Sequence, residues 1–226
     1  MTGRSATRIR TIAGILDRTY GPRTWRPEED VLGQLIKTIL SQNTSDTNSL
    51  RAFHRLRQRF PSWSQVHRAR RHQVADAIRS GGLADIKAGR IKAILRHIYR
   101  EHPQGDLSFL ESWPTDRIRD YLGRFEGVGE KTIACVLLFA LGRPVMPVDT
   151  HVRRVSQRLG LIPPETDAAR AHRLLQEAVP ASLVYAFHLH LIEHGRAVCR
   201  ARKPICGRCP LRRHCQAFRE RWLQIR

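Results

Sequence analysis

The sequence contains no hydrophobic stretch long enough to cross a membrane. Its longest apolar run, Ile133–Leu141, has nine residues, whereas a helix that spans a bilayer needs about 20. The N-terminal segment MTGRSATRIRTIAGILDRTY lacks the apolar core of a secretory signal peptide. We find neither convincing alternation of apolar and polar residues nor an internal repeat. These absences argue against a membrane protein, a secreted protein, a β-rich fold and a repeat protein.

Acidic residues are scarce, with 20 Asp and Glu against 40 Lys and Arg, and the formal net charge is +20. An excess of this size indicates a polyanionic partner, either nucleic acid or an acidic membrane surface. The alternative is a basic surface that is only solvated. Arginine-rich segments such as His67–His72 do not distinguish between these partners. A hydrophobic content of 41% with 27% charged residues is ordinary for a globular protein.

Cysteine is also scarce, and four of the five cysteines crowd into residues 199–215. A secreted protein of this size held by disulfides would not show this distribution, so we expect a reducing compartment. If the polyanionic partner is nucleic acid, a cytoplasmic, nucleoid-associated protein is expected. The arginine-rich N-terminus has no acid before Asp17 and weakly resembles an organelle transit peptide, so organelle targeting stays open. The fifth cysteine, Cys135, lies within the apolar run and is expected to be a small buried hydrophobic residue.

What is present is helical periodicity along nearly the whole chain. At the N-terminus Ile9, Ile12, Ile15 and Leu16 fall on one helix face, which favours a packed first helix over a targeting peptide. Residues 31–40 form a second apolar stripe, and we expect the acids of Glu28–Asp30 in its first turn, where negative charge suits the helix dipole. Polar residues 41–46 can cap a helix that continues through Leu50, Phe53 and Leu56. Further helices fit residues 74–78, 91–99, 118–122, 152–159, 169–179 and 183–194. The sequence therefore predicts an all-α chain of about ten helices, in one large domain or two lobes.

Chemistry is concentrated in residues 122–154. Gly127-Val128-Gly129 can form a tight hairpin whose backbone approaches a ligand closely, and the following helix N-terminus can hold a phosphate. Lys131 falls in the first turn of that helix, where the dipole and nearby cations favour the free amine that nucleophilic attack requires. Asp149 lies 18 residues later, at a helix N-cap position. The structural alternatives are a packing turn for the glycine hairpin, a phosphate contact for Lys131 and a simple helix cap for Asp149.

The four clustered cysteines have the spacing C-x6-C-x2-C-x5-C, formed by Cys199, Cys206, Cys209 and Cys215. Four thiolates suit either tetrahedral zinc or a [4Fe–4S] cluster, and the spacing by itself does not decide between them. A second metal site at His188, His190 and His194 lacks a carboxylate or cysteine to complete it.

These motifs together resemble the endonuclease III family of DNA base-excision glycosylases, over about residues 28–217. The family reads L-P-G-V-G-x-K-T-A with the aspartate of V-D-T-H 18 residues after the lysine, and this chain has FEGVGEKTI and VDTH. Glu126 stands where the family has proline, and Ile133 stands where it has alanine. The resemblance implies that Lys131 attacks C1′ of the damaged nucleoside and that Asp149 takes up its proton or stabilises the cationic sugar.

The resemblance extends to two loops upstream. LSQNTSD, residues 40–46, matches the family loop L-S-x-Q-x-x-D, which fills the gap left by a flipped base. Asn43 stands where endonuclease III has glutamine, with Gln42 just before it. GLADIKA, residues 82–88, is similar to the family's G-L-Y-x-x-K-A. This similarity implies that Leu83 is an apolar wedge that unstacks the opposite DNA strand. The DNA-binding residues expected from the resemblance are Gln42, Asn43, Leu83, Gly127, Val128, Gly129, Thr132 and His151.

The resemblance also implies the cofactor and the architecture. The cysteine spacing matches the iron–sulfur loop of the family, so a [4Fe–4S] cluster is expected, with basic residues of that loop on phosphates. The candidates for phosphate contact are Arg200, Arg202, Lys203, Arg208, Arg212 and Arg213. Two helical lobes are expected, a helical barrel domain at 29–142 with the helix–hairpin–helix and a cluster domain at 1–28 plus 143–226. DNA is expected to lie in the cleft between them.

The function expected from the resemblance is a monomeric, bifunctional DNA glycosylase/AP lyase that removes oxidised pyrimidines from double-stranded DNA. One alternative is a monofunctional mismatch glycosylase acting on adenine or thymine, whose relatives lack a lysine at the position of Lys131. The other is a non-enzymatic, basic, metal-containing DNA-binding module. The preferred lesion and opposite base, the efficiency of the lyase step and any redox role of the cluster are left open by the sequence.

Overall fold

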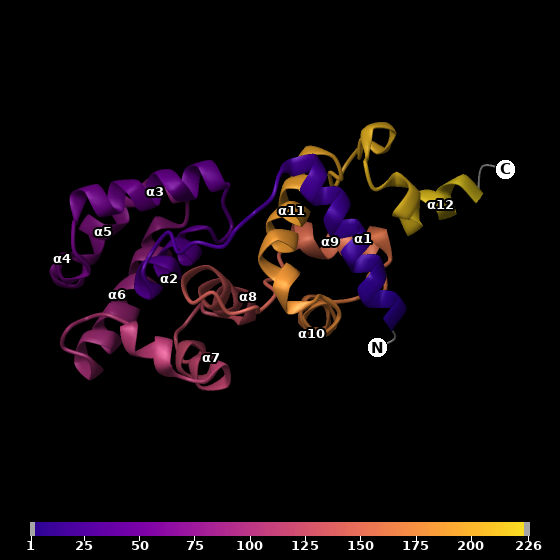
Figure 1. Cartoon of the computed structure of the whole chain (residues 1–226). Coiled ribbons are helices and arrows are strands. Elements are labelled where there is room, and N and C mark those ends of the chain that lie inside the picture. The colour runs from indigo at the N-terminus through magenta and orange to yellow at the C-terminus, as the bar shows by residue number, and fades with distance from the viewer. Residues whose placement is uncertain (1–2, 224–226) are drawn as a thin grey trace. The chain divides into compact units, whose positions relative to one another are not determined.

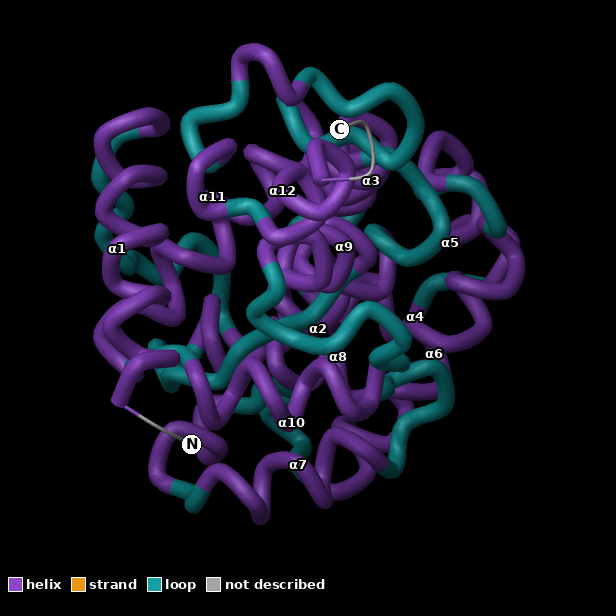
Figure 2. Tube along the Cα trace, turned by 90° about the vertical axis from the view of Figure 1, so that its right-hand side faces the viewer, coloured by secondary structure: helices purple, strands orange, loops and turns teal. Residues whose placement is uncertain are grey.

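The structure is a computed structural model that describes residues 3–223, and it gives side chains for residues 5–220. This part of the chain forms twelve α-helices and no strand (Figures 1 and 2), which confirms the all-α fold. None of the helices found in it is both long and apolar enough to cross a membrane.

The chain divides into two compact units, each described by itself below. Residues 27–143 form one unit, which we call the hairpin unit, and residues 1–26 with 144–226 form the other, which we call the cysteine unit. The domain limits expected from the resemblance, 29–142 and 1–28 plus 143–226, stay a prediction.

In the hairpin unit, α2 is buried on almost every face: its apolar residues and also Gln34 and Thr38 are buried, and only Lys37 is partly exposed. It packs against α3, α6 and α8. Figure 1 shows these helices grouped with α4, α5 and α7. The helices of this unit are α2 (Val31–Leu40), α3 (Asp46–Arg59), α4 (Trp63–Arg68), α5 (Arg71–Ala77), α6 (Ala84–Glu101), α7 (Thr115–Gly123) and α8 (Glu130–Cys135).

The start of α2 differs from the expectation. Asp30 is the N-cap, and its Oδ1 accepts a hydrogen bond from the Gly33 backbone N–H at 2.6 Å. The acids of Glu28–Asp30 therefore precede the helix instead of lying in its first turn. A carboxylate at the cap both satisfies a free N–H group and keeps its charge close to the positive end of the dipole.

The apolar run after Lys131 does not continue as an α-helix. At Cys135 the chain changes to a π-helical turn, Val136–Ala140. The Leu141 N–H donates to the Val136 carbonyl at 3.3 Å, a bond that spans five residues. Cys135 is buried, as expected for a small hydrophobic residue.

Two short helices, α4 and α12 (Gln216–Leu223), are absent from the sequence prediction. The six residues of α4 are too few to show a helical period. A capping box starts it, however, with Ser62 and Gln65 bonding to each other's backbone N–H groups. The S-x-x-Q pattern of that box is visible in the sequence and predicts the start of a helix.

The cysteine unit contains α1 (Gly3–Tyr20), α9 (Thr150–Leu159), α10 (Ala168–Ala178), α11 (Val184–Ala197) and α12. The expected packed first helix is confirmed, because Ile9, Ile12 and Leu16 are fully buried and α1 packs beside α11 (Figure 1). The four clustered cysteines follow α11 in a segment of short turns that ends at α12.

Candidate functional site

The glycine hairpin joins α7 to α8 and has the geometry expected of it. Gly127 has φ +78°, a conformation that side-chain-bearing residues rarely adopt, and a Cβ there would lie 2.7 Å from Arg90 Nε. Gly129 is the N-cap of α8, with extended backbone and open space where its Cβ would be. Lys131 is the second residue of α8 and is partly exposed. The hairpin therefore opens a helix and presents the lysine in its first turn, as the sequence predicted.

Gln42 is hydrogen-bonded to this hairpin. Its Nε2 donates to the Gly127 carbonyl at 2.8 Å and lies 3.4 Å from Thr132 Oγ1, while its Oε1 accepts from Arg90 Nη1 at 3.3 Å. Arg90 also forms an ion pair with Glu126, with 3.7 Å between Nε and Oε1. Glu126, which stands at the family's proline position, is largely exposed, so this ion pair contributes little. Contacts of Gln42, Gly127 and Gly129 with DNA stay predictions.

Val128 and Thr132 have buried side chains. Any contact that Val128 makes with DNA must therefore use its backbone. The Thr132 hydroxyl lies near Gln42 inside the unit, so the expected DNA contact of this residue also stays a prediction.

The two upstream loops each present an exposed side chain on a residue with positive φ. Asn43 is exposed and has φ +51°. Leu83 has φ +49°, and 51% of its surface is exposed. Leu83 is therefore not a core leucine. A large apolar side chain held out into solvent fits the wedge role that the resemblance implies, although that role is not tested by the fold.

Lys87, for which the sequence predicts no role, lies at the base of both loops. Its side chain is 1% exposed, and Nζ donates to the carbonyls of Leu40 and Gly81, each at 2.8 Å. Burial lowers the pKa of this amine. The burial of Lys87 could have been predicted from its spacing. It precedes Ile91, Ile94 and Leu95 by four, seven and eight residues and so lies on the apolar stripe of α6.

Asp149 lies in the cysteine unit as the N-cap of α9, which confirms the predicted cap. Its Oδ1 accepts a hydrogen bond from the Val152 N–H at 2.7 Å. The cap uses one carboxylate oxygen and holds the side chain, which is partly exposed, at the positive end of the helix. Two residues on, His151 Nδ1 lies 3.0 Å from Arg154 Nη2.

The three histidines of α11 are buried and do not form a metal site. His188 Nδ1 lies 2.9 Å from the Pro147 carbonyl, and His190 Nε2 lies 2.9 Å from the Gly21 carbonyl. His194 Nδ1 lies 2.9 Å from the Tyr20 hydroxyl, and burial lowers the pKa of this imidazole to about 4. Backbone carbonyls therefore account for His188 and His190, whereas His194 lies between Tyr20 and the cysteine loop, with its Nε2 3.6 Å from Cys209 Sγ.

Cys199, Cys206, Cys209 and Cys215 line one cavity of about 530 Å³. None of them is in a disulfide. Burial raises the pKa of the Cys209 thiol to about 11 and also raises that of Cys215. The cavity is bounded by Arg158, whose Nη1 is 3.4 Å from Cys199 Sγ and whose carbonyl is 3.3 Å from Cys215 Sγ.

By their chemistry the four thiols suit a metal centre. In the described chain, no group of three or more His, Cys, Asp or Glu side chains is arranged as the ligands of a single metal ion. Four thiols that line one cavity suit either a polynuclear cluster or zinc, so the cavity does not decide between them.

Comparison with known proteins adds to this geometry. The profile of the HhH-GPD superfamily of base excision DNA repair proteins matches residues 36–181. The endonuclease III of Sulfolobus acidocaldarius is 32% identical over 84% of this chain and 83% of its own length. The chain belongs to the HhH-GPD superfamily.

Other similar proteins agree with this membership. A candidate DNA glycosylase of Arabidopsis thaliana is 38% identical over 80% of this chain, which spans only 59% of that relative's length. Two solved structures of endonuclease III with DNA, one non-covalent and one a trapped covalent intermediate, each have a TM-score of 0.81 and 27% identity. Each alignment covers 96% of this chain and 98% of the other.

Proposed function

We propose that this protein is a bifunctional DNA glycosylase/AP lyase that excises oxidised pyrimidines from duplex DNA during base excision repair. The observation that carries the proposal is the position of Lys131, partly exposed in the first turn of α8 directly after the glycine hairpin. Similarity to endonuclease III, including a trapped covalent intermediate of that enzyme with DNA, supports it.

Lys131 acts as the nucleophile in this proposal. Its neutral amine forms a bond to C1′ of the damaged nucleoside while the glycosidic bond breaks, and the base leaves with the electron pair and gains a proton. Opening of the sugar ring then gives a Schiff base with the lysine. Loss of a proton from C2′ expels the 3′ phosphate, which cuts the strand by β-elimination, and water finally releases the lysine.

Asp149 assists this chemistry as a carboxylate. It takes up the proton that the attacking amine loses, or it stabilises the positive charge on the sugar. Because the cap of α9 fixes one of its oxygens, the carboxylate is held in one orientation at little entropic cost.

The exposed loops and the hairpin bind the DNA. Asn43 fills the gap left by the flipped base, and Leu83 separates bases of the opposite strand. The backbone around Gly127 and Gly129 holds a phosphate. His151 contributes a further contact at the start of α9.

Cys199, Cys206, Cys209 and Cys215 hold a [4Fe–4S] cluster in this proposal. When bound, the cluster fixes the fold of the loop between its ligands, so that basic side chains such as Arg208 and Arg212 meet phosphates in a set arrangement. Iron and sulfide analysis of the purified protein distinguishes a cluster, which contains both in equal amounts, from zinc.

Borohydride trapping tests the lyase directly. On duplex DNA that contains thymine glycol or an abasic site, we expect a covalent adduct with the wild-type protein and none with Lys131→Ala. The control is Lys37→Ala, which removes another partly exposed lysine of the hairpin unit and should leave the adduct unchanged.

The same assay separates the alternatives. An adduct that persists without Lys131 overturns its role as nucleophile. Base release from mismatched duplexes without any adduct indicates a monofunctional mismatch glycosylase. Binding with neither base release nor strand cleavage indicates a DNA-binding module without enzymatic activity.

A further inference from the structure

Lys87 is an ammonium buried in the interior of the hairpin unit, where few lysines are found. Its side chain is 1% exposed and lies on the same face of α6 as the buried residues Ile91 and Ile94. A charge in such a place is unfavourable unless hydrogen bonds replace the lost water. The position of the ammonium is therefore set by the groups that it bonds.

Those groups are the ends of two chain segments that lead into the loops expected to enter DNA. Leu40 is the last residue of α2, and the loop carrying Asn43 follows it. Gly81 directly precedes Gly82 and Leu83. Since Lys87 Nζ donates to both carbonyls at 2.8 Å, one ammonium ties the starting points of both loops to α6.

The Leu83 loop needs such a constraint because its backbone is strained. Leu83 has φ +49°, in the left-handed region that residues with a Cβ disfavour, whereas Asn43 has φ +51°, which asparagine adopts more readily than most residues. Conformations of this kind persist only where the surrounding structure enforces them. The Leu83 carbonyl accepts the first helical hydrogen bond of α6, from the Lys87 backbone N–H at 2.9 Å, and this bond does not depend on the lysine side chain.

We propose that Lys87 is a positioning residue that holds the Asn43 loop and the Leu83 loop together in the arrangement that separates stacked bases. It is buried and does not touch DNA itself. By fixing the two loops to one atom, it lets Asn43 and Leu83 enter the duplex as a unit and resist displacement by the bases. This inference rests on the proposed function, because it assigns the loops their DNA-separating role.

Lys92 provides a matched control on the same helix. Its Nζ also bonds backbone carbonyls, those of Val66, His67 and Ala69, and burial also lowers the pKa of its amine. These carbonyls belong to the end of α4 and to the residue after it, not to either loop. Lys87→Met and Lys92→Met therefore remove the same kind of interaction, but only Lys87→Met releases the loops.

The experiment uses a duplex with 2-aminopurine opposite a stable abasic-site analogue. Unstacking of 2-aminopurine raises its fluorescence, so the signal reports base separation independently of catalysis. We expect Lys87→Met to lose most of this rise and to lose about tenfold in its preference for abasic over undamaged duplex, the effect of relaxing one strained loop residue. Lys92→Met should keep both. Thermal melts establish that each variant is folded, and Lys87→Leu, which likewise has no N–H donor, replaces Lys87→Met if the latter does not melt cooperatively.

The outcomes are distinct. A folded Lys87 variant with the same fluorescence rise and the same preference as Lys92→Met overturns the inference and leaves Lys87 a structural residue only. If the wild-type protein neither unstacks 2-aminopurine nor prefers the abasic duplex, the proposed function fails, and the inference fails with it. If the wild-type protein does both while only the Lys87 variants lose them, the positioning role is supported.

Discussion

Gly127 and Gly129 frame one hairpin, but different physical constraints act on them. Gly127 has φ +78° with Arg90 directly in front of it, whereas Gly129 has extended backbone and open space around it. The first glycine is therefore required by the fold of the hairpin. At Gly129 the protein itself leaves room for a larger residue. The lack of a Cβ there matters only for a ligand that approaches the hairpin.

This difference predicts that alanine lowers stability at Gly127 but mainly weakens DNA binding at Gly129. Gly127→Ala should lower the free energy of unfolding by about 1–2 kcal/mol, because alanine disfavours a positive φ. Gly129→Ala should change it by less than about 0.5 kcal/mol, yet it should weaken binding to duplex DNA because the new methyl group keeps phosphate away from the backbone. Chemical denaturation and fluorescence anisotropy measure the two quantities.

Each glycine variant is the control for the other. Equal losses of stability would contradict the assignment of strain to Gly127, and unchanged DNA binding by Gly129→Ala would contradict a phosphate contact at the hairpin.

At the scale of elements, α9 depends on the same side chain that the proposed reaction uses. Asp149 caps the helix through Oδ1, and a capping side chain contributes about 1 kcal/mol. Asparagine is about as good a cap as aspartate but carries no charge. Substitution by asparagine therefore separates the structural role of Asp149 from its chemical role.

We expect Asp149→Asn to keep the stability of the wild-type protein and to lose most of the lyase activity. Asp149→Ala should lose the activity and also about 1 kcal/mol of stability, because the Val152 N–H loses its partner. Thermal denaturation and single-turnover strand cleavage measure these effects. If Asp149→Asn cleaves at the wild-type rate, the carboxylate is a cap and nothing more.

The helix α6 shows where prediction from sequence stops at this scale. Its apolar period is readable, and the helix was expected over residues 91–99 inside the observed Ala84–Glu101. The roles of Lys87 and Arg90 were not expected, because each acts on residues far away in the sequence. The carbonyl of Leu40 is 47 residues from Lys87, and the Oε1 of Gln42 is 48 residues from Arg90.

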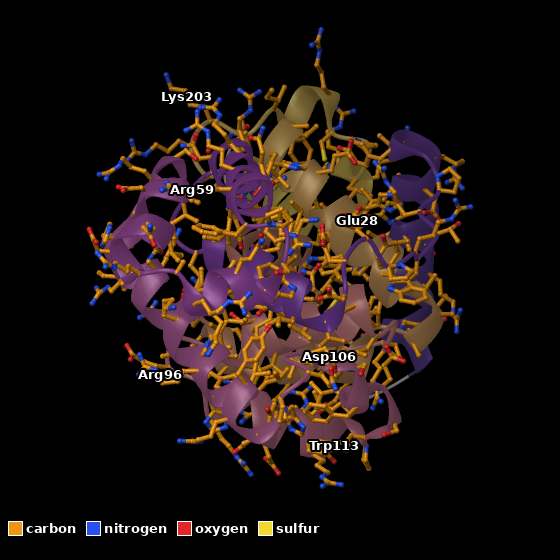
Figure 3. All side chains as sticks on the ribbon, turned by 90° about the vertical axis from the view of Figure 1, so that its left-hand side faces the viewer. Glu28, Arg59, Arg96, Asp106, Trp113 and Lys203 are labelled. Atoms are coloured by element: carbon orange, nitrogen blue, oxygen red, sulfur yellow. The ribbon has the colours of Figure 1, made fainter. Side chains whose placement is uncertain are left out.

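At the scale of the whole molecule, the excess of positive charge is the dominant property. The net charge is +20, and exposed basic side chains such as Arg59 of α3 and Arg96 of α6 lie at the surface in Figure 3. Such charge binds phosphates and releases the counterions that surround DNA. It contributes affinity without sequence or lesion preference.

We therefore expect affinity for undamaged duplex to fall steeply with salt. The slope of log affinity against log salt should be about −0.9 for each phosphate that the protein neutralises. The preference for abasic over undamaged duplex should change much less, because it comes from contacts to the gap and not from phosphates. Anisotropy titrations over a series of salt concentrations test this, and a slope near zero would show that the charge does not serve DNA binding.

The amino-acid sequence by itself determined most of the helices, the glycine hairpin with Lys131 in the first turn of α8, the cap at Asp149 and the set of four cysteines. All of these depend on residues close together in the chain, through the helical period, capping or short spacing. Tertiary structure alone decided that Lys87 is buried beneath two loops, that Gln42 bonds the hairpin from 85 residues away, and that the cysteines surround a cavity of about 530 Å³. Burial and long-range bonding depend on how helices pack, and one lysine in an otherwise apolar stripe meets its partners only when α2 and α6 come together.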